Sequence, residues 1–167
     1  MELFNAIFAR RSIRKYQNKA LEAEKLTKIL EAAMAAPTAR NKQPWRFITV
    51  QSEEGKNRIM AAHPYSLMLK TAPCAVIVCA DKTEATDFFQ QDCAAAIQNM
   101  LLSATDLGLG SVWLGVYPNE ERTNGICKAF NLPGNIIPVG IVVLGYADET
   151  KGRENRFDAA KIHKENW

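Results

Sequence analysis

A nearly continuous apolar run, Cys74–Cys79, constrains the fold of this chain more than any other feature of its sequence. Pro73 precedes the run and Asp81 follows it closely, so its length fits a strand and not a helix. A strand that carries no polar residue on either side is buried on both faces of its sheet. The run therefore predicts a buried central strand.

The longest predicted helix, from Phe88 to Leu107, is rich in alanine and apolar on most of its sides. A helix with so little polar surface is expected near the centre of the molecule. Its apolar surface is also larger than a helix needs in order to cover one small sheet, so we expect part of this helix to face a partner subunit.

The other predicted elements alternate along the chain. Helical spacing of apolar residues begins at Leu3–Phe8, and Pro37 ends the second helix. The Asn124-Gly125 pair weakens the last helix. Because no linker interrupts the series, one mixed α/β domain is expected over residues 1–167. The predicted helices are Leu3–Phe8, Ala20–Ala35, Glu53–Ala62, Phe88–Leu107 and Glu120–Phe130, and the strands are Arg46–Val50, Cys74–Cys79, Val112–Leu114 and Val139–Leu144.

Composition excludes several classes of protein. The formal net charge of +3 does not by itself demand a nucleic-acid partner, and the longest apolar stretch is about half of a membrane span. The N-terminus has its basic residues after its apolar ones, the wrong order for a secretory signal. Four cysteines without a C-x-x-C pair and only two histidines predict no metal site. We expect reduced cysteines in a cytoplasmic protein.

A basic cluster, Arg10–Lys15, has three interpretations. It could be a solvated surface run, or a nucleic-acid patch, although the aromatic stacking residues of such a patch are missing nearby. The third interpretation is a phosphate site, because the planar fork of arginine binds phosphate oxygens in pairs and the Ser12 hydroxyl adds a donor.

The loop from Pro37 to Trp45 contains two side-chain amides and a hydroxyl between two prolines. Asn41 and Gln43 each offer a donor and an acceptor, so they could bind the edge of a heterocycle that alternates C=O and N–H groups. Alternatively, they satisfy backbone groups within an ordinary loop.

The glycines between Gly108 and Gly115 do not form a dinucleotide-binding motif, because they follow a helix and lead into a strand. We expect Gly108 and Gly110 to end the helix and form the turn after it. Gly115 ends a strand, where a missing side chain lets a flat ligand approach the backbone. Trp113 could simply pack in the core. With no nucleophile or acid–base motif in the chain, an enzyme of this sequence needs a cofactor for its chemistry.

Taken together and in order, these segments resemble the nitroreductase family of flavin mononucleotide (FMN) enzymes. The likeness covers nearly the whole chain and rests on five collinear segments, Arg10–Tyr16, Ala36–Trp45, Asp92–Leu102, Leu107–Gly115 and Arg156–Trp167. The resemblance implies an α+β fold in which helices surround a central, mostly antiparallel sheet. It also implies an intertwined homodimer with non-covalently bound FMN at the subunit interface.

The resemblance further implies the contacts of the cofactor. Its phosphate and ribityl chain would be held by the N-terminal cluster and a tail arginine, either Arg153 or Arg156. In the loop, Asn41 and Gln43 would meet the polar edge or side of the flavin, while Pro37–Ala39 would line the neighbouring subunit's pocket. Leu114 and Gly115 would lie against the ring, with a backbone N–H there donating toward flavin N5. The expected residues are Arg10, Arg11, Ser12, Arg14, Pro37, Thr38, Ala39, Asn41, Gln43, Trp113, Leu114, Gly115, Arg153 and Arg156.

The implied reaction transfers a hydride from NADH or NADPH to flavin N5 and then electrons to nitroaromatics, quinones or activated alkenes, with ping-pong kinetics. The alternative is a protein of the same fold that binds or senses flavin with little turnover. A DNA-binding module is a third, more remote interpretation. Arg40 departs from the family pattern by its size and charge, and we hypothesise that it favours anionic substrates or the nicotinamide phosphate.

Overall fold

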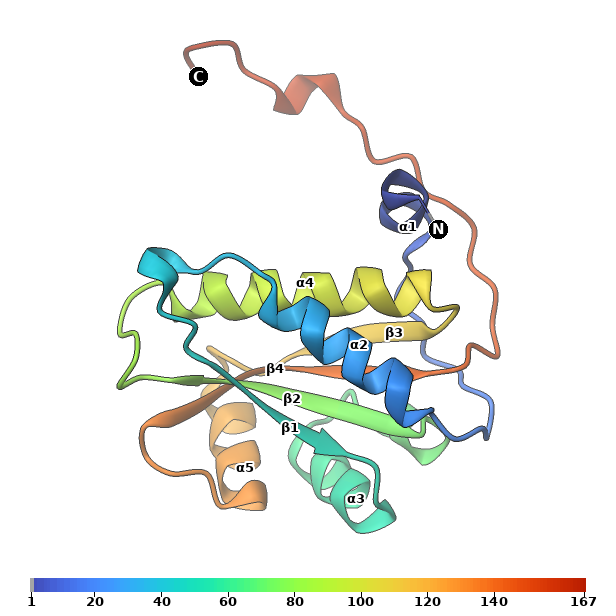
Figure 1. Cartoon of the computed structure of the whole chain (residues 1–167), viewed down its shortest axis with the longest axis vertical. Coiled ribbons are helices and arrows are strands. Elements are labelled where there is room, and N and C mark those ends of the chain that lie inside the picture. The colour runs from blue at the N-terminus through green and yellow to red at the C-terminus, as the bar shows by residue number, and fades with distance from the viewer. Residues whose placement is uncertain (1) are drawn as a thin grey trace.

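The computed structural model describes residues 2–167, and its strands form a four-stranded sheet in the order β1-β2-β4-β3 (Figure 1). Every neighbouring pair is antiparallel, which confirms the expected α+β class. The strands are β1 (Trp45–Val50), β2 (Cys74–Asp81), β3 (Gly110–Gly115) and β4 (Ile136–Gly145). β2 and β4 lie in the middle, with Ile77 opposite Ile141, and this central position explains why the run Cys74–Cys79 is apolar throughout.

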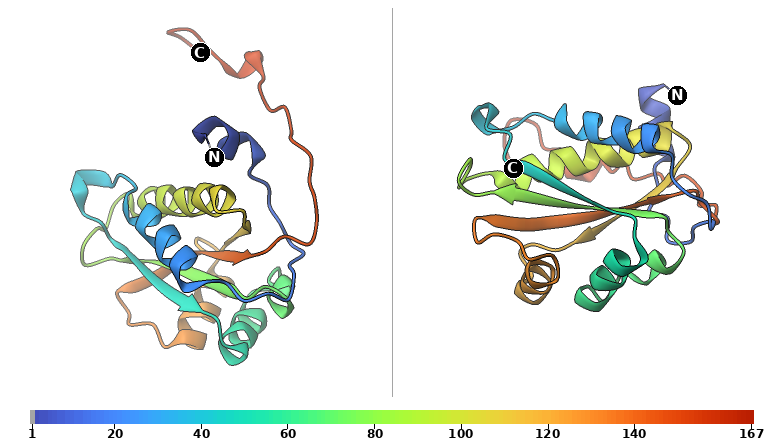
Figure 2. Two further views of the ribbon diagram at one scale, coloured as in Figure 1. Left: turned by 45° about the vertical axis from the view of Figure 1, so that its right-hand side comes forward. Right: turned by 60° about the horizontal axis from the view of Figure 1, so that its bottom comes forward.

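Helices cover both faces of the sheet (Figure 2). α2 (Ala23–Met34) and α4 (Phe89–Asp106) lie on one face, and α3 (Glu53–Ala62) and α5 (Glu120–Phe130) on the other. The two-residue period of β2 divides the core between them. Val76 and Val78 belong to the cluster that includes Ile97 of α4, whereas Ile77 packs in the second cluster.

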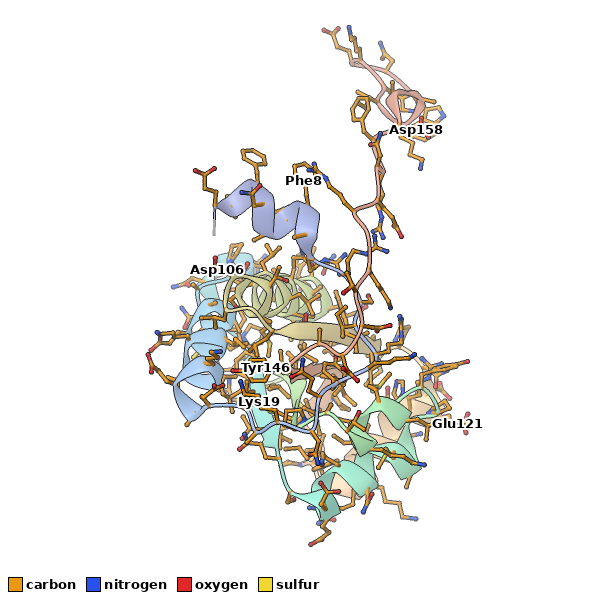
Figure 3. The ribbon with its side chains drawn as sticks, turned by 90° about the vertical axis from the view of Figure 1, so that its right-hand side faces the viewer. Phe8, Lys19, Asp106, Glu121, Tyr146 and Asp158 are labelled. Carbon is orange, nitrogen blue, oxygen red and sulfur yellow. The ribbon has the colours of Figure 1, made fainter. Side chains whose placement is uncertain are left out.

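Both termini leave the layered body on the same side. α1 (Leu3–Ala9) stands above the C-terminal end of α4, and the chain after β4 extends past α1 and away from the sheet (Figures 1 and 2). Residues 10–17 run beside the sheet, where the Ile13 N–H donates to the Ser111 carbonyl at 2.9 Å. Further along, the Lys19 ammonium lies 3.6 Å from the centre of the Tyr146 ring (Figure 3).

The predicted elements are all present, with two details that local patterns missed. Gly108 ends α4 with a positive φ of 75°, as expected, but the prediction that Gly110 belongs to the turn was wrong. Gly110 begins β3, and a Cβ there would lie 2.9 Å from Ile13 Cγ2, so the residue is small because the N-terminal segment packs on it. α5 continues through Gly125, whose Cβ would lie 3.2 Å from the Ala62 carbonyl of α3.

Across residues 2–167, each helix is either too short or too polar to cross a lipid bilayer.

Candidate functional site

A basic cavity of about 760 Å³ lies between α1, the middle of α4 and the segment 153–157 that follows the sheet. Four arginines from the two ends of the chain line it, namely Arg10, Arg11, Arg153 and Arg156, together with the carboxylate of Glu154. In Figure 3, Phe8 marks the side of the cavity formed by α1, and Asp158 marks the part of the C-terminal tail that lies beyond the cavity. Four positive charges against one negative charge give the cavity an electrostatic preference for an anion.

The four arginines are not equivalent. Arg11 donates to the Gly152 carbonyl at 2.6 Å and forms an ion pair with Glu154, while Arg156 binds the other oxygen of that carboxylate at 2.8 and 2.6 Å. The Arg153 guanidinium stacks 4.0 Å from the centre of the Phe8 ring.

Arg10 has no side-chain hydrogen bond to any of residues 2–167. Burial lowers the pKa of its guanidinium, and repulsion from Arg156 and Arg11 adds to the effect, while the Glu154 charge opposes it. An anion in the cavity would relieve this repulsion, so Arg10 is the guanidinium most available to a ligand.

Two other residues of the basic cluster have different positions. Ser12 bridges to Ser111 of β3, and its carbonyl accepts a hydrogen bond from Lys151 Nζ at 2.6 Å. Arg14 is exposed and does not line the cavity; its backbone N–H donates to Glu149 Oε1 at 2.5 Å. Of the predicted residues in the basic cluster, the structure therefore brings Arg10 and Arg11 to the cavity, but not Ser12 or Arg14.

The loop from Pro37 to Gln43 has an unusual backbone. Arg40, Asn41 and Gln43 have φ values of 54°, 54° and 49°, in the left-handed region that costs a non-glycine residue free energy. The Thr38 hydroxyl accepts from the Gln43 N–H at 3.1 Å, and Gln43 Nε2 donates to Asn41 Oδ1 at 2.8 Å. Such strain, maintained by local hydrogen bonds, is typical of a ligand-binding loop.

Asp92 anchors this loop to α4, a role that the sequence did not reveal. Its Oδ1 accepts from the Ala39 N–H at 3.0 Å, and its Oδ2 is buried without a hydrogen-bond partner among residues 2–167. The side chain is 5% exposed. One sequence signal was available, since Asp92 is an acidic residue in the first turn of an otherwise apolar helix.

The end of β3 offers a bare stretch of backbone. A Cβ on Gly115 would meet no atom within 4 Å, so this glycine faces open space instead of a packed neighbour. Leu114 beside it is buried, whereas Trp113 is 37% exposed, and its indole edge packs against Gly140. A flat ligand can therefore approach the backbone at Gly115.

Two further residues that sequence analysis missed hold the Gly115 carbonyl. His63 Nε2 lies 2.9 Å from this oxygen and Arg122 Nη1 lies 3.1 Å from it. Burial lowers the pKa of His63, and the charge of Arg122 contributes to this shift. No local pattern pairs these residues, because they come from the ends of different helices, α3 and α5.

Within one chain, the arginine cavity and the loop 37–43 are separate, and Trp113, Leu114 and Gly115 do not line the cavity. The arginine cavity adjoins α1 and Gln98 in the middle of α4, whereas the loop 37–43 is attached near the start of α4 through Asp92. Figure 1 shows the loop at the N-terminal end of this helix and the start of the tail, just after β4, beside its C-terminal end. A ligand that contacts both groups would therefore need the loop of one chain and the arginines of another.

A smaller cavity, about 230 Å³, lies between this loop and residues 83–88. Arg40 and Lys42 contribute its positive charges, Glu84 and Asp87 its negative ones, and the exposed Phe88 forms part of its wall. This arrangement places Arg40 next to a space that can admit part of a ligand.

Comparison with known proteins gives a consistent result. The model of the nitroreductase family matches residues 7–146. A protein of Methanothermobacter thermautotrophicus named "Putative NADH dehydrogenase/NAD(P)H nitroreductase" is 46% identical over all of this chain and 88% of its own length. A crystal structure under the same name from Parabacteroides distasonis has a TM-score of 0.96 and 35% identity, over 99% of this chain and 98% of its own.

An FMN-dependent nitroreductase from Clostridium difficile is also similar, with a TM-score of 0.92 and 32% identity over 98% of this chain and 99% of its own. The family model covers far more than half of the chain, and the relatives align over nearly all of it. The agreement of motifs, fold and overall sequence establishes that this chain belongs to the nitroreductase family.

Proposed function

We propose that this protein is an FMN-dependent oxidoreductase that uses NADH or NADPH and works as a homodimer in the cytoplasm. The arginine cavity is the observation that carries the proposal, because it collects four guanidinium groups, and that of Arg10 makes no side-chain hydrogen bond to residues 2–167. The FMN dependence of the similar Clostridium difficile protein supports the choice of cofactor.

The residues present fit the two ends of FMN. Arg10 and Arg153 are available for the phosphate, while Arg11 and Arg156 are shared with Glu154. Of the two tail candidates, Arg156 already has a carboxylate partner, whereas Arg153 has none among residues 2–167. The bare backbone at Gly115 fits the flat ring.

The dimer would complete each site. Apolar side chains on α1 and the tail are exposed in one chain, including Phe4 at 70% and Phe157 at 76%. Burying such residues against a second copy stabilises a dimer. The partner's loop 37–43 would then meet the ring, with Asn41 and Gln43 toward its polar edge, which explains why that loop lies far from the arginines of its own chain.

FMN held in this site would supply the hydride and electron transfer between NADH or NADPH and a second substrate. The protein's part is to bind and orient. Arginines hold the phosphate, the Leu114–Gly115 backbone supports the ring, and the loop restricts one edge. Because both substrates would use the same exposed face in turn, the kinetics should be ping-pong, with nitroaromatics, quinones or activated alkenes as acceptors.

The test begins with the purified protein. We expect flavin absorbance that is released on denaturation, gel filtration at twice the chain mass of 18.6 kDa, and loss of the flavin colour when NADH or NADPH is added without oxygen. A protein that retains FMN but is not reduced would instead support the flavin-sensing alternative.

A matched pair of variants locates the phosphate site. Arg10 and Arg14 belong to the same basic cluster, but only Arg10 lines the cavity. We expect Arg10→Ala to weaken FMN binding by about tenfold or more, since a charge-assisted hydrogen bond contributes about 1.5–3 kcal/mol, and Arg14→Ala to have little effect. Equal losses in both variants would contradict this placement.

We also propose that Arg40 favours anionic substrates or the nicotinamide phosphate, because its guanidinium lines the small cavity beside the loop. Arg40→Ala should raise the KM of NADPH more than that of NADH. An unchanged ratio, with an unchanged preference among acceptors, would remove this role.

A further inference from the structure

The Gly115 carbonyl is the only oxygen for which the residues 2–167 supply both a histidine and an arginine side chain as hydrogen-bond partners. His63 Nε2 is 2.9 Å away and Arg122 Nη1 is 3.1 Å away. Neither residue lines the arginine cavity or belongs to the loop 37–43. They converge from two helices on one atom beside the open backbone.

His63 is held as a neutral donor. Its Nδ1 accepts the Tyr65 N–H at 3.3 Å, so the ring proton is assigned to Nε2, which then donates to the carbonyl. The side chain is 2% exposed, and burial keeps its pKa below the ordinary value. A buried, neutral ring in one tautomer is a rigid support.

Arg122 is positioned just as firmly. It lies in the first turn of α5, where its N–H donates to the capping oxygen Oδ1 of Asn119 at 3.0 Å. Its guanidinium lies 5.1 Å from the centre of the Tyr65 ring. Cap and ring together direct the charged fork toward Gly115.

These contacts restrain one particular peptide unit. The Gly115 carbonyl and the Val116 N–H belong to the same planar unit and point in opposite directions. The Val116 N–H donates to the Val139 carbonyl of β4 at 3.2 Å, while His63 and Arg122 hold the oxygen. This peptide unit cannot rotate without breaking hydrogen bonds on both sides. The bonds therefore keep the side-chain position of Gly115, where a Cβ would meet no atom within 4 Å, facing open space.

We propose that His63 and Arg122 are positioning residues that fix the Gly115 backbone against the ring of the cofactor, and that the Arg122 charge favours the more negatively charged state of that cofactor. This inference rests on the proposed function, since it takes the flavin ring to lie at Gly115. A fixed guanidinium one hydrogen bond from the contacting backbone raises the midpoint potential of an acceptor that becomes more negative on reduction.

The experiment compares Arg122→Gln with Arg58→Gln. Arg58 is a close match, because its Nη1 donates to the Ala129 carbonyl at 3.3 Å and its guanidinium lies 4.9 Å from the Phe130 ring, away from Gly115. Two properties are measured: amide hydrogen exchange at Val116 and Tyr117 in the protein without cofactor, and the midpoint potential of bound FMN.

For Arg122→Gln we expect about tenfold faster exchange at Val116, as for the loss of one charge-assisted hydrogen bond. We expect reduced FMN to bind about tenfold less tightly relative to oxidised FMN, which corresponds to a potential about 30 mV lower for a two-electron couple. Arg122→Lys keeps the charge and should restore most of the potential. Arg58→Gln should match the wild type in both measurements.

The outcomes separate the two proposals. If the wild type binds no FMN, the proposed function fails, and the exchange data still decide whether the two side chains restrain the peptide. If the wild type binds FMN but Arg122→Gln has the potential and exchange rate of Arg58→Gln, the positioning role is overturned. As a second variant, His63→Gln should speed exchange at Val116 with little change in potential, because it removes no charge.

Discussion

Replacing Gly115 by alanine should weaken FMN binding without weakening the fold. In the protein alone, the new Cβ would meet no atom within 4 Å, and the residue does not have a left-handed φ that alanine would resist. Glycine in a strand is more flexible in the unfolded chain than alanine. We therefore expect the free energy of unfolding to rise by about 0.4–1 kcal/mol.

The loss of affinity can be worked out from the same geometry. The methyl group would extend about 1.5 Å, one carbon–carbon bond, into the space assigned to the ring. A ring displaced by this amount gives up about ten atom pairs of about 0.1–0.2 kcal/mol each and weakens a backbone hydrogen bond. The sum, about 2 kcal/mol, predicts a Kd for FMN about 30-fold higher.

The assay is a fluorescence titration of FMN into the protein without cofactor, with thermal unfolding of the same samples. Gly134→Ala is the control, because a Cβ at Gly134 also meets no atom within 4 Å, but this residue lies in the turn before β4. Wild-type affinity in Gly115→Ala would refute the idea that the ring rests on this strand end.

Three further predictions concern the scaffold of the site. Gly140→Ala should lower the free energy of unfolding by about 1–3 kcal/mol in urea titrations, because its Cβ would lie 2.5 Å from Trp113 Nε1 and 3.0 Å from Ile97 Cδ1; unchanged stability would mean that the indole can move away. Asp92→Ala should speed hydrogen exchange at the Ala39 amide and weaken FMN binding severalfold, whereas Asp92→Asn, which keeps an acceptor oxygen, should exchange like the wild type. Identical behaviour of the two variants would count against the role of Asp92 in anchoring the loop. The contribution of His63 to stability should be constant above about pH 6.5 and decrease as the pH falls below it, because the lowered pKa of His63, which Arg122 and Tyr65 face, leaves the folded state binding fewer protons than the unfolded chain. Urea unfolding of His63→Gln should therefore show a weaker decline in stability between pH 6.5 and 5 than the wild type, and parallel curves would argue against His63 as the source.

Much of the fold could be predicted from the sequence, because burial leaves a local periodic record. The apolar run of β2 and the alanine-rich stretch of α4 identified the central strand and the longest helix within one or two residues of their ends. Local periodicity did not predict the place of Gly110 at the start of β3. Its neighbour Ile13 is almost a hundred residues away in the chain, and nothing local distinguishes a glycine in a turn from one under a crossing segment.

The candidate site was only partly predictable, for the same reason. Motif resemblance selected Arg10, the loop 37–43 and Gly115, but it also selected Arg14, which the structure leaves at the surface. The resemblance did not assign a role to Asp92, and it missed His63 entirely. Their importance comes from single hydrogen bonds to distant backbone atoms, and such bonds leave no periodic pattern.

By itself, therefore, the sequence determined the type and order of the elements and the residues with the chemistry to bind an anion and a flat heterocycle. Only the tertiary structure decided which of them meet. It placed β4 between β2 and β3, joined the N-terminal arginines to the tail, and separated both from the loop at the other end of α4. The physical reason is that hydrophobic periodicity reports whether a residue is buried, whereas strand pairing and side-chain contacts depend on partners up to 143 positions apart in the chain.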